Sequence, residues 1–136
     1  MLAAACRPAP KPAHQDDINT IRLVLDQQVS AWNSGSIDGF MQGYWQSDSL
    51  RFIGKRGIRY GYDSVAANYK RHYNSIEKMG NLSFSDLTIL PLASVPELYN
   101  VTGRWRITGT DSAAGFFSLL VERKKEGFKI TADHTW

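Results

Sequence analysis

Apolar residues near the start of the chain recur every three or four positions. The members of this set are Ile18, Ile21, Leu25, Val29 and Trp32. That spacing places their side chains on one face of a helix. We expect Asp16 or Asp17 to cap the start of this helix, and residues 33–35 (Asn-Ser-Gly) to end it.

Two further helices are predicted downstream. A second, shorter helix should begin at Ser36, and a third should begin at Asp63 or Ser64 and end at Gly80. Between them, residues 50–54 predict a brief strand, and a basic, glycine-rich loop follows it. The apolar or aromatic side chains expected to face inward are Ile37, Phe40, Met41, Tyr44 and Trp45 on the second helix, and Val65, Tyr69, His72, Tyr73 and Ile76 on the third.

After Gly80 the apolar period changes to the two-residue alternation of strands. An offset between Phe84 and Leu87 predicts a bulge in the first of these strands, and residues 98–108, 116–123 and 128–136 predict three more. Helices that are followed by a run of antiparallel strands define an α+β fold. We therefore expect a curled antiparallel sheet that wraps around about three helices in a cone-shaped domain.

Alternation also predicts which strand residues face the helices. The inward sets are Val101, Gly103, Trp105 and Ile107, then Phe117, Leu119 and Val121, and finally Ile130, Ala132, His134 and Trp136. Neighbours in a strand point to opposite faces, so Asp133 and His134 cannot form a mutual acid–base pair. Arg104 and Arg106 fall on the outer face, where they mark either a solvated surface or a dimer surface.

Composition and charge exclude several classes of protein. The chain has 136 residues, 43% of them hydrophobic and 21% charged, which is typical of one soluble globular domain. The net charge of +3 is too small to predict nucleic-acid binding. A local excess of cations does exist at Arg51, Lys55, Arg56, Arg59, Lys70 and Arg71. We interpret it as a solvated face, and the alternative is attraction of an anionic ligand or membrane surface.

Residues 1–16 differ in composition from the domain that we expect over residues 17–136. Small apolar residues precede Cys6, and a Pro- and Ala-rich linker follows it, as at the end of a bacterial lipoprotein signal. One interpretation is a lipidated Cys6 that anchors a cell-envelope protein to the membrane; the other is a cytoplasmic protein with an irregular terminus. A single cysteine allows no internal disulfide, and the three scattered histidines predict no metal site.

Several segments of the chain carry a family resemblance. These are AWNSG at residues 31–35, DGFMQGYW from Asp38, VTGRW at 101–105, GFFSLL from Gly115 and ITADHTW at 130–136. In these segments the chain resembles the SnoaL-like, domain-of-unknown-function branch of the nuclear transport factor 2-like superfamily, which has a cystatin-like fold. The resemblance implies isomerase, dehydratase or cyclase chemistry, and a homodimer joined through the sheet. The first strand carries no inward acid of the steroid isomerase type, and the nearest acid is Asp48.

Two functional hypotheses follow. In the first, the domain binds a small hydrophobic or aromatic molecule in a cavity lined by Trp32, Tyr44, Tyr69, Trp105 and Trp136. His134 is then the candidate for acid–base catalysis, because imidazole titrates near neutral pH; the alternative is a structural histidine of the core. In the second hypothesis, side chains fill the cone and the domain is a non-catalytic dimeric association module. No motif in the chain calls for a cofactor.

Overall fold

The computed structural model describes residues 14–136, so Cys6 and the linker around it lie outside the described residues. The first helix, α1 (Gln15–Asn33), buries Ile21, Leu25 and Trp32, as the periodicity predicts. The predicted cap is wrong, because the helix begins before Asp16 and Asp17 and both lie in its first turn. The carboxylate of Asp17 instead accepts hydrogen bonds from Tyr99, at 2.7 Å, and from Arg123, at 2.6 Å.

Helix α2 (Ile37–Met41) starts at Ser36, whose hydroxyl accepts a hydrogen bond from the amide of Gly39. The third predicted helix is in fact two helices, α3 (Tyr62–His72) and α4 (Ile76–Met79). A break at residues 73–75 turns the chain, so that Ile76 is 71% exposed instead of sharing the inner stripe. Ser75 caps α4, since its hydroxyl accepts from the amide of Lys78.

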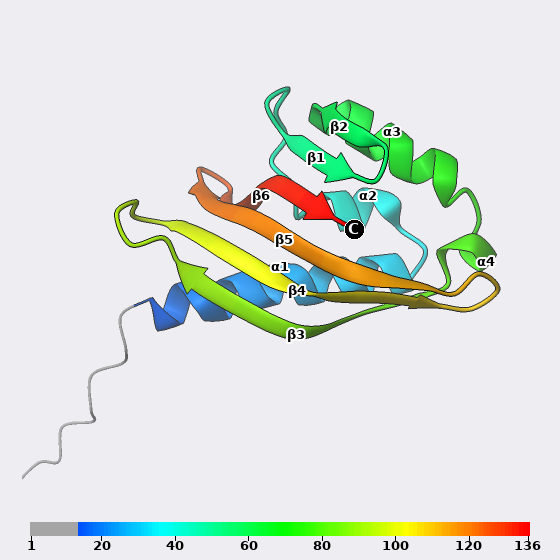
Figure 1. Ribbon diagram of the computed structural model, residues 1–136, viewed down its shortest axis with the longest axis horizontal. Helices are drawn as coiled ribbons and strands as arrows, with labels where there is room; N and C mark the ends of the chain where they lie inside the picture. Colours follow the sequence, from blue (N-terminus) through cyan, green and yellow to red (C-terminus); the bar gives the residue numbers. More distant parts are fainter. Residues whose placement is uncertain (1–13) are drawn as a thin grey trace, which may run out of the picture.

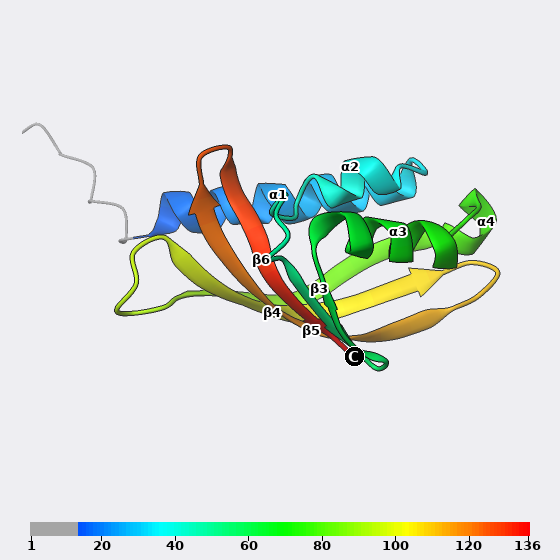
Figure 2. The ribbon, with the colours of Figure 1, turned by 90° about the horizontal axis from the view of Figure 1, so that it is seen from above.

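The sheet has six strands in the order β2-β1-β6-β5-β4-β3. The long strands are β3 (Asn81–Pro91), β4 (Leu98–Thr108), β5 (Ala113–Lys124) and β6 (Gly127–Thr135), and they pair antiparallel with one another. β1 (Arg51–Gly54) pairs parallel to β6, so the sheet is mixed and not wholly antiparallel. The α+β class and the curled sheet are confirmed, and Figures 1 and 2 show the sheet curving beneath α1, α2 and α3.

The segment predicted as a basic loop contains a strand, β2 (Gly57–Tyr60), which forms a hairpin with β1. Lys55 and Arg56 make the turn of this hairpin, and Gly57 follows at φ +110°. Only glycine adopts that conformation without strain, and a positive φ directly after a two-residue turn is typical of a bulged hairpin. The hairpin therefore presents both cations at its tip.

Two bulges shape the sheet. The predicted offset in β3 is confirmed, since its register with β4 shifts between Ser85 and Thr88. A second shift in register lies in the pairing of β5 with β6. Val121 pairs with Ile130 and Leu120 pairs with Ala132, so Thr131 is an extra residue in β6. The inward sets predicted for β4 and β5 are confirmed, because Val101, Ile107 and Leu119 are buried. On β6 the extra residue reverses the alternation beyond Ile130.

Candidate functional site

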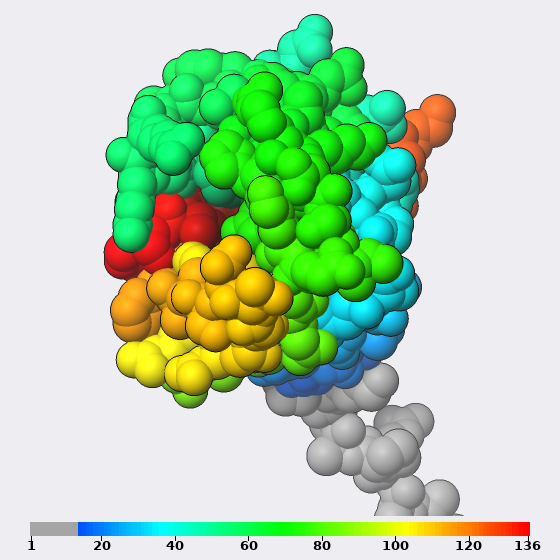
Figure 3. All heavy atoms as spheres, turned by 90° about the vertical axis from the view of Figure 1, so that its right-hand side faces the viewer, coloured from blue at the N-terminus to red at the C-terminus, as the bar shows by residue number. Residues whose placement is uncertain are grey.

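A cavity of about 420 Å³ lies between the concave face of the sheet and helices α1, α2 and α3. This volume falls in the range of ligand pockets, which is roughly 300 to 1,000 Å³. Figure 3 looks at the end of the molecule where the β1–β2 hairpin, α3 and the end of β6 meet the β4–β5 turn. The aromatic residues that line the cavity are Trp32, Phe40, Tyr44, Phe52, Tyr69, Tyr73, Phe84, Trp105, Phe117 and Trp136.

All five aromatic residues predicted for the pocket line this cavity. Trp32 is almost fully buried, and its indole N–H donates to the carbonyl oxygen of Met79 at 2.9 Å, which satisfies the buried donor. Tyr44 and Tyr69 point their hydroxyl groups toward each other. Trp136 lies at the edge, 48% exposed, and stacks on Phe116 outside the cavity.

Trp105 forms part of the wall on β4 and is tightly fitted there. A Cβ atom added at Gly115 would lie 2.7 Å from its indole nitrogen, so the wall depends on a glycine at that position. The buried indole N–H has no hydrogen-bond partner among the described residues. Because an unpaired buried donor is unfavourable, the indole N–H of Trp105 lowers the stability of the fold at a position where the ring shapes the cavity.

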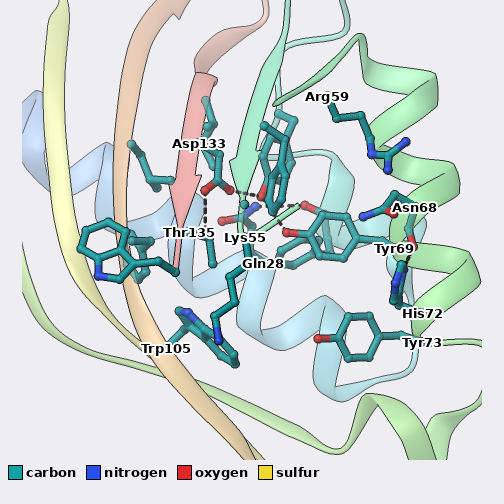
Figure 4. Close-up of a pocket in the computed structure, with 18 of the residues that line it drawn as sticks. Gln28, Lys55, Arg59, Asn68, Tyr69, His72, Tyr73, Trp105, Asp133 and Thr135 are labelled. Atoms are coloured by element: carbon teal, nitrogen blue, oxygen red, sulfur yellow. Dashed lines mark hydrogen bonds between the residues drawn. The ribbon is translucent and has the colours of Figure 1, made fainter. Parts of the chain in front are cut away.

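Asp133 is the one acid that lines the cavity among residues 14–136, and it is only 3% exposed. Its carboxylate accepts a hydrogen bond from Tyr44, at 2.6 Å, and another from Thr135, at 2.6 Å. The hydroxyl oxygens of Tyr44 and Tyr69 are 3.3 Å apart. Since Tyr44 donates its proton to Asp133, its oxygen accepts from Tyr69. Figure 4 shows this chain of three side chains across the pocket.

Burial dominates the electrostatics of this chain. Loss of solvation raises the pKa of Asp133, although the hydrogen bonds from Thr135 and Tyr44 and the nearby His134 lower it in part. Burial also raises the pKa of Tyr44 and of Tyr69, and the charge of Asp133 raises both further. A carboxyl group whose pKa is raised by an apolar site is a stronger base than one in water, and the tyrosines stay protonated as donors.

The predicted orientation of His134 is wrong. The extra residue at Thr131 turns Asp133 and Thr135 inward and His134 outward, where it is exposed and packs against Trp136 with ring centroids 4.8 Å apart. His134 does not line the cavity. Simple alternation missed Asp133 for the same reason. The signal in the sequence is a single acid within the last predicted strand, at residues 130–136.

The mouth of the cavity is polar and basic. Lys55, Arg56 and Arg59 line it from the β1–β2 hairpin, whose strand β1 pairs with β6 beside Asp133, and Asn68 and His72 line it from α3. Figure 4 shows Arg59, Asn68 and His72 across the pocket from Asp133 and Thr135. The cavity therefore has an aromatic interior with a buried acid in its wall and a cationic rim at its mouth.

Neither a metal site nor a membrane span emerges from residues 14–136. No group of three or more His, Cys, Asp or Glu side chains within that range is arranged to hold a metal ion. No helix in the same range is long and apolar enough to cross a membrane.

Comparison with solved structures places the chain among proteins of one fold. It is similar to an NTF-2-like protein of unknown function from Shewanella oneidensis MR-1, with 36% identity and a TM-score of 0.81. That match covers 88% of this chain and 98% of the other. No protein-family model and no curated protein matches the sequence.

More distant structures agree in fold. A nuclear transport factor 2 superfamily protein from Salmonella enterica serovar Typhimurium shares 15% identity, covers 88% of this chain and 92% of its own, and has a TM-score of 0.69. A ketosteroid isomerase-like protein from Erwinia carotovora atroseptica shares 13% identity over 89% of this chain and 95% of its own, with a TM-score of 0.66. At these identities the likeness concerns the fold alone.

Proposed function

The chain belongs to the nuclear transport factor 2-like family, and from that premise we propose that it binds a small, flat hydrophobic molecule in its aromatic cavity and moves a proton on it through Asp133. The observation that carries this proposal is the buried carboxylate, which lies at the cavity wall and accepts a hydrogen bond from Tyr44. An acid held in an apolar pocket, with a raised pKa and tyrosine donors beside it, is an arrangement suited to general base catalysis.

The reaction class that fits is proton transfer at a carbon next to a carbonyl group. The C–H bond breaks, its proton goes to a carboxylate oxygen of Asp133, and the electron pair moves onto the carbonyl oxygen as an enolate. The hydroxyl of Tyr69 turns from Tyr44 to donate to that oxygen, which stabilises the developing charge. Return of the proton to another carbon completes an isomerisation. Alternatively, the enolate carbon attacks a second carbonyl group, and the proton on Asp133 goes to the alkoxide oxygen that forms, which completes a cyclisation.

A base-sensitive probe tests this chemistry without the natural substrate. 5-Nitrobenzisoxazole is a flat aromatic molecule whose N–O bond breaks when a base removes its ring C–H proton, and a coloured phenolate is released. We expect the protein to accelerate this ring opening, with a rate that rises with pH as Asp133 ionises. Asp133→Asn should reduce the acceleration about a hundredfold, which is the lower range for general base catalysis.

The exposed His134 provides the control. His134→Gln should retain most of the wild-type rate, because this side chain lies outside the cavity, and the rise of the rate should move to a slightly higher pH, since His134 lowers the pKa of Asp133. Tyr69→Phe should give an intermediate rate, since the base is kept and one donor is lost. An unchanged rate in Asp133→Asn, or no acceleration by the wild-type protein, would contradict the role of Asp133 as a base.

The outer face of the sheet supports a second proposal, self-association. Phe116 and Trp136 are 43% and 48% exposed and stack with ring centroids 6.0 Å apart, and the guanidinium of Arg104 lies over the Phe116 ring. Exposed aromatic residues next to arginine are typical of protein interfaces. We propose that two copies join through this face. The dimeric association module and the ligand-binding protein are then compatible, because the cavity opens on the other side of the sheet.

A further inference from the structure

Three cations converge on the mouth of the cavity. Lys55 and Arg56 occupy the turn of the β1–β2 hairpin, Arg59 follows on β2, and all three line the cavity. None of them forms an ion pair with an acid of residues 14–136, and residues 1–13 contain neither Asp nor Glu. Among the described residues, the acid of the same cavity is Asp133 on β6, the strand beside β1, and it forms no ion pair with any of the three.

Arg56 is held in position by the end of α3. Its guanidinium lies 3.3 Å from Nε2 of His72, and Nδ1 of the same ring lies 2.9 Å from the carbonyl oxygen of Asn68. These contacts agree if Nδ1–H donates to the carbonyl and Nε2 accepts from Arg56. An arginine that binds a neutral acceptor keeps its full positive charge and further N–H donors, so it is oriented without being neutralised.

Position distinguishes these cations from others on the surface. Arg106 on β4 and Lys125 in the β5–β6 turn are also without an ion pair among residues 14–136, but neither lines a cavity. Lys70 at the end of α3 pairs with Asp38 at 2.8 Å, and a cation there also suits the helix dipole. Lys55, Arg56 and Arg59 have no such acidic partner among residues 14–136.

We propose that this mouth binds the anionic group of the ligand, so that the ligand class is a flat apolar molecule bearing one carboxylate or phosphate. The apolar body enters among Trp32, Tyr69 and Trp105, a carbonyl oxygen approaches Tyr69, and the anion stays at the hairpin. This inference rests on the proposed function, because it names the substrate class of the same cavity. Arginine and lysine are the usual partners of both anions, and a rim position limits the desolvation cost.

A matched pair of fluorescent probes distinguishes the proposed hydrophobic cavity from the proposed anion site at its mouth. 8-Anilinonaphthalene-1-sulfonate and N-phenyl-1-naphthylamine share one aromatic skeleton, and only the first carries an anion. Both brighten in an apolar site. We expect both probes to bind, and the sulfonate to bind about tenfold more tightly, a preference that weakens with added salt.

The variants are matched in charge and composition. The test variant combines Lys55→Gln, Arg56→Gln and Arg59→Gln, and the control combines Arg22→Gln, Arg106→Gln and Lys125→Gln, whose side chains are exposed and outside the cavity. The test variant should lose the preference for the sulfonate and keep its affinity for the neutral probe, which also shows that the cavity is intact. The control should behave as the wild-type protein does.

Four results would overturn the inference. Equal affinity for both probes in the wild-type protein, or an unchanged preference in the test variant, would remove the anion site while leaving the hydrophobic cavity as proposed. An equal loss of the preference for the sulfonate in both triple variants would mean that this preference depends on net charge alone. If neither probe binds, the proposed cavity function fails and this inference fails with it.

Competition then identifies the anion. Displacement of the sulfonate probe by 2-naphthoate, 1-naphthyl phosphate and neutral 2-naphthol should follow charge, with the naphthol weakest. The tighter of the two anions assigns the ligand to the carboxylates or to the phosphates. Equal displacement by all three would contradict the inference.

Discussion

Asp133 has an electrostatic cost that the fold must offset. Its carboxyl group lies among aromatic rings, and the pKa is raised because burial disfavours the charged form. The hydrogen bonds from Thr135 and Tyr44 recover only part of the lost solvation. A buried charge that lowers stability at a cavity wall is typical of a functional residue. This electrostatic cost should be visible in the pH dependence of the free energy of unfolding.

We expect Asp133→Asn to remove the part of the pH dependence of unfolding that comes from the Asp133 carboxyl group. The carboxyl group of the folded protein holds its proton above the ordinary pKa of 3.8, so the folded state binds more protons than the unfolded state in that window. The wild-type protein should therefore lose stability relative to the variant as pH rises from about 4, by about 1.4 kcal/mol for each unit of pKa shift.

Urea unfolding of both proteins between pH 4 and about pH 8 measures this difference. Subtraction of the two curves removes the titration of acids that both proteins share. A difference in unfolding free energy that stays constant with pH, or that favours the wild-type protein as pH rises, would show that the pKa of Asp133 is not raised in the folded state.

The elements position the site through their irregularities more than through their regular parts. The extra residue Thr131 turns Asp133 into the cavity. Gly80 connects α4 to β3 with φ +59° and ψ −152°, and it lies against the backbone of Thr108. Trp32 on α1 donates to the carbonyl oxygen of Met79 beside this glycine. The connection therefore sets how α1 and the cavity wall meet.

Gly80→Ala should destabilise the protein strongly. A Cβ atom at this position would collide with the carbonyl oxygen of Thr108, and the backbone conformation is one that glycine alone adopts readily. We expect a loss of about 2 to 4 kcal/mol in the free energy of unfolding, from backbone strain and overpacking together. Chemical denaturation would measure it.

Gly57→Ala is the matched comparison. Gly57 also has a positive φ, +110°, but a Cβ atom there would meet nothing within 4 Å. Its replacement should cost only the strain, about 1 to 2 kcal/mol. Equal losses in the two variants would mean that the contact with Thr108 contributes nothing.

At the scale of the whole molecule, the curled sheet separates two surfaces with different uses. The concave face carries the cavity, the outer face carries Phe116 and Arg104, and Trp136 lies at the edge between them, where it lines the cavity and stacks on Phe116. Because side chains alternate along β5, Phe116 points outward where Phe117 points in. Self-association through the outer face would leave the cavity mouth open.

Phe116→Glu tests that surface. We expect the wild-type protein to sediment as a dimer and the variant as a monomer, because two copies would bring like charges together in a contact that loses an aromatic ring. Leu23→Glu serves as the control, since Leu23 is 59% exposed on α1, away from the outer face of the sheet. A wild-type protein that remains monomeric at every concentration in sedimentation velocity would contradict the proposal.

Periodicity was enough to predict the long elements. The helical stripe of Ile21, Leu25 and Trp32 and the strand at residues 98–108 lie where their spacing places them. The predictions for shorter elements are less accurate: the pattern predicts the strand at residues 51–54 but a loop where β2 occurs at residues 57–60, and one helix where α3 and α4 occur. These segments have few residues over which a period could repeat, and tertiary packing decides their ends.

The sequence by itself determined the α+β class, the family resemblance and the aromatic character of the interior, because these depend on residue type and on periods that persist over many residues. Only the tertiary structure decided the chemistry of the site. One extra residue in β6 exchanged the expected His134 for Asp133, and the hairpin brought Lys55, Arg56 and Arg59 to the same cavity. The first depends on the register between β5 and β6, where a bulge reverses every side chain beyond it, and the second depends on the pairing of β1 with β6, which are distant in the sequence.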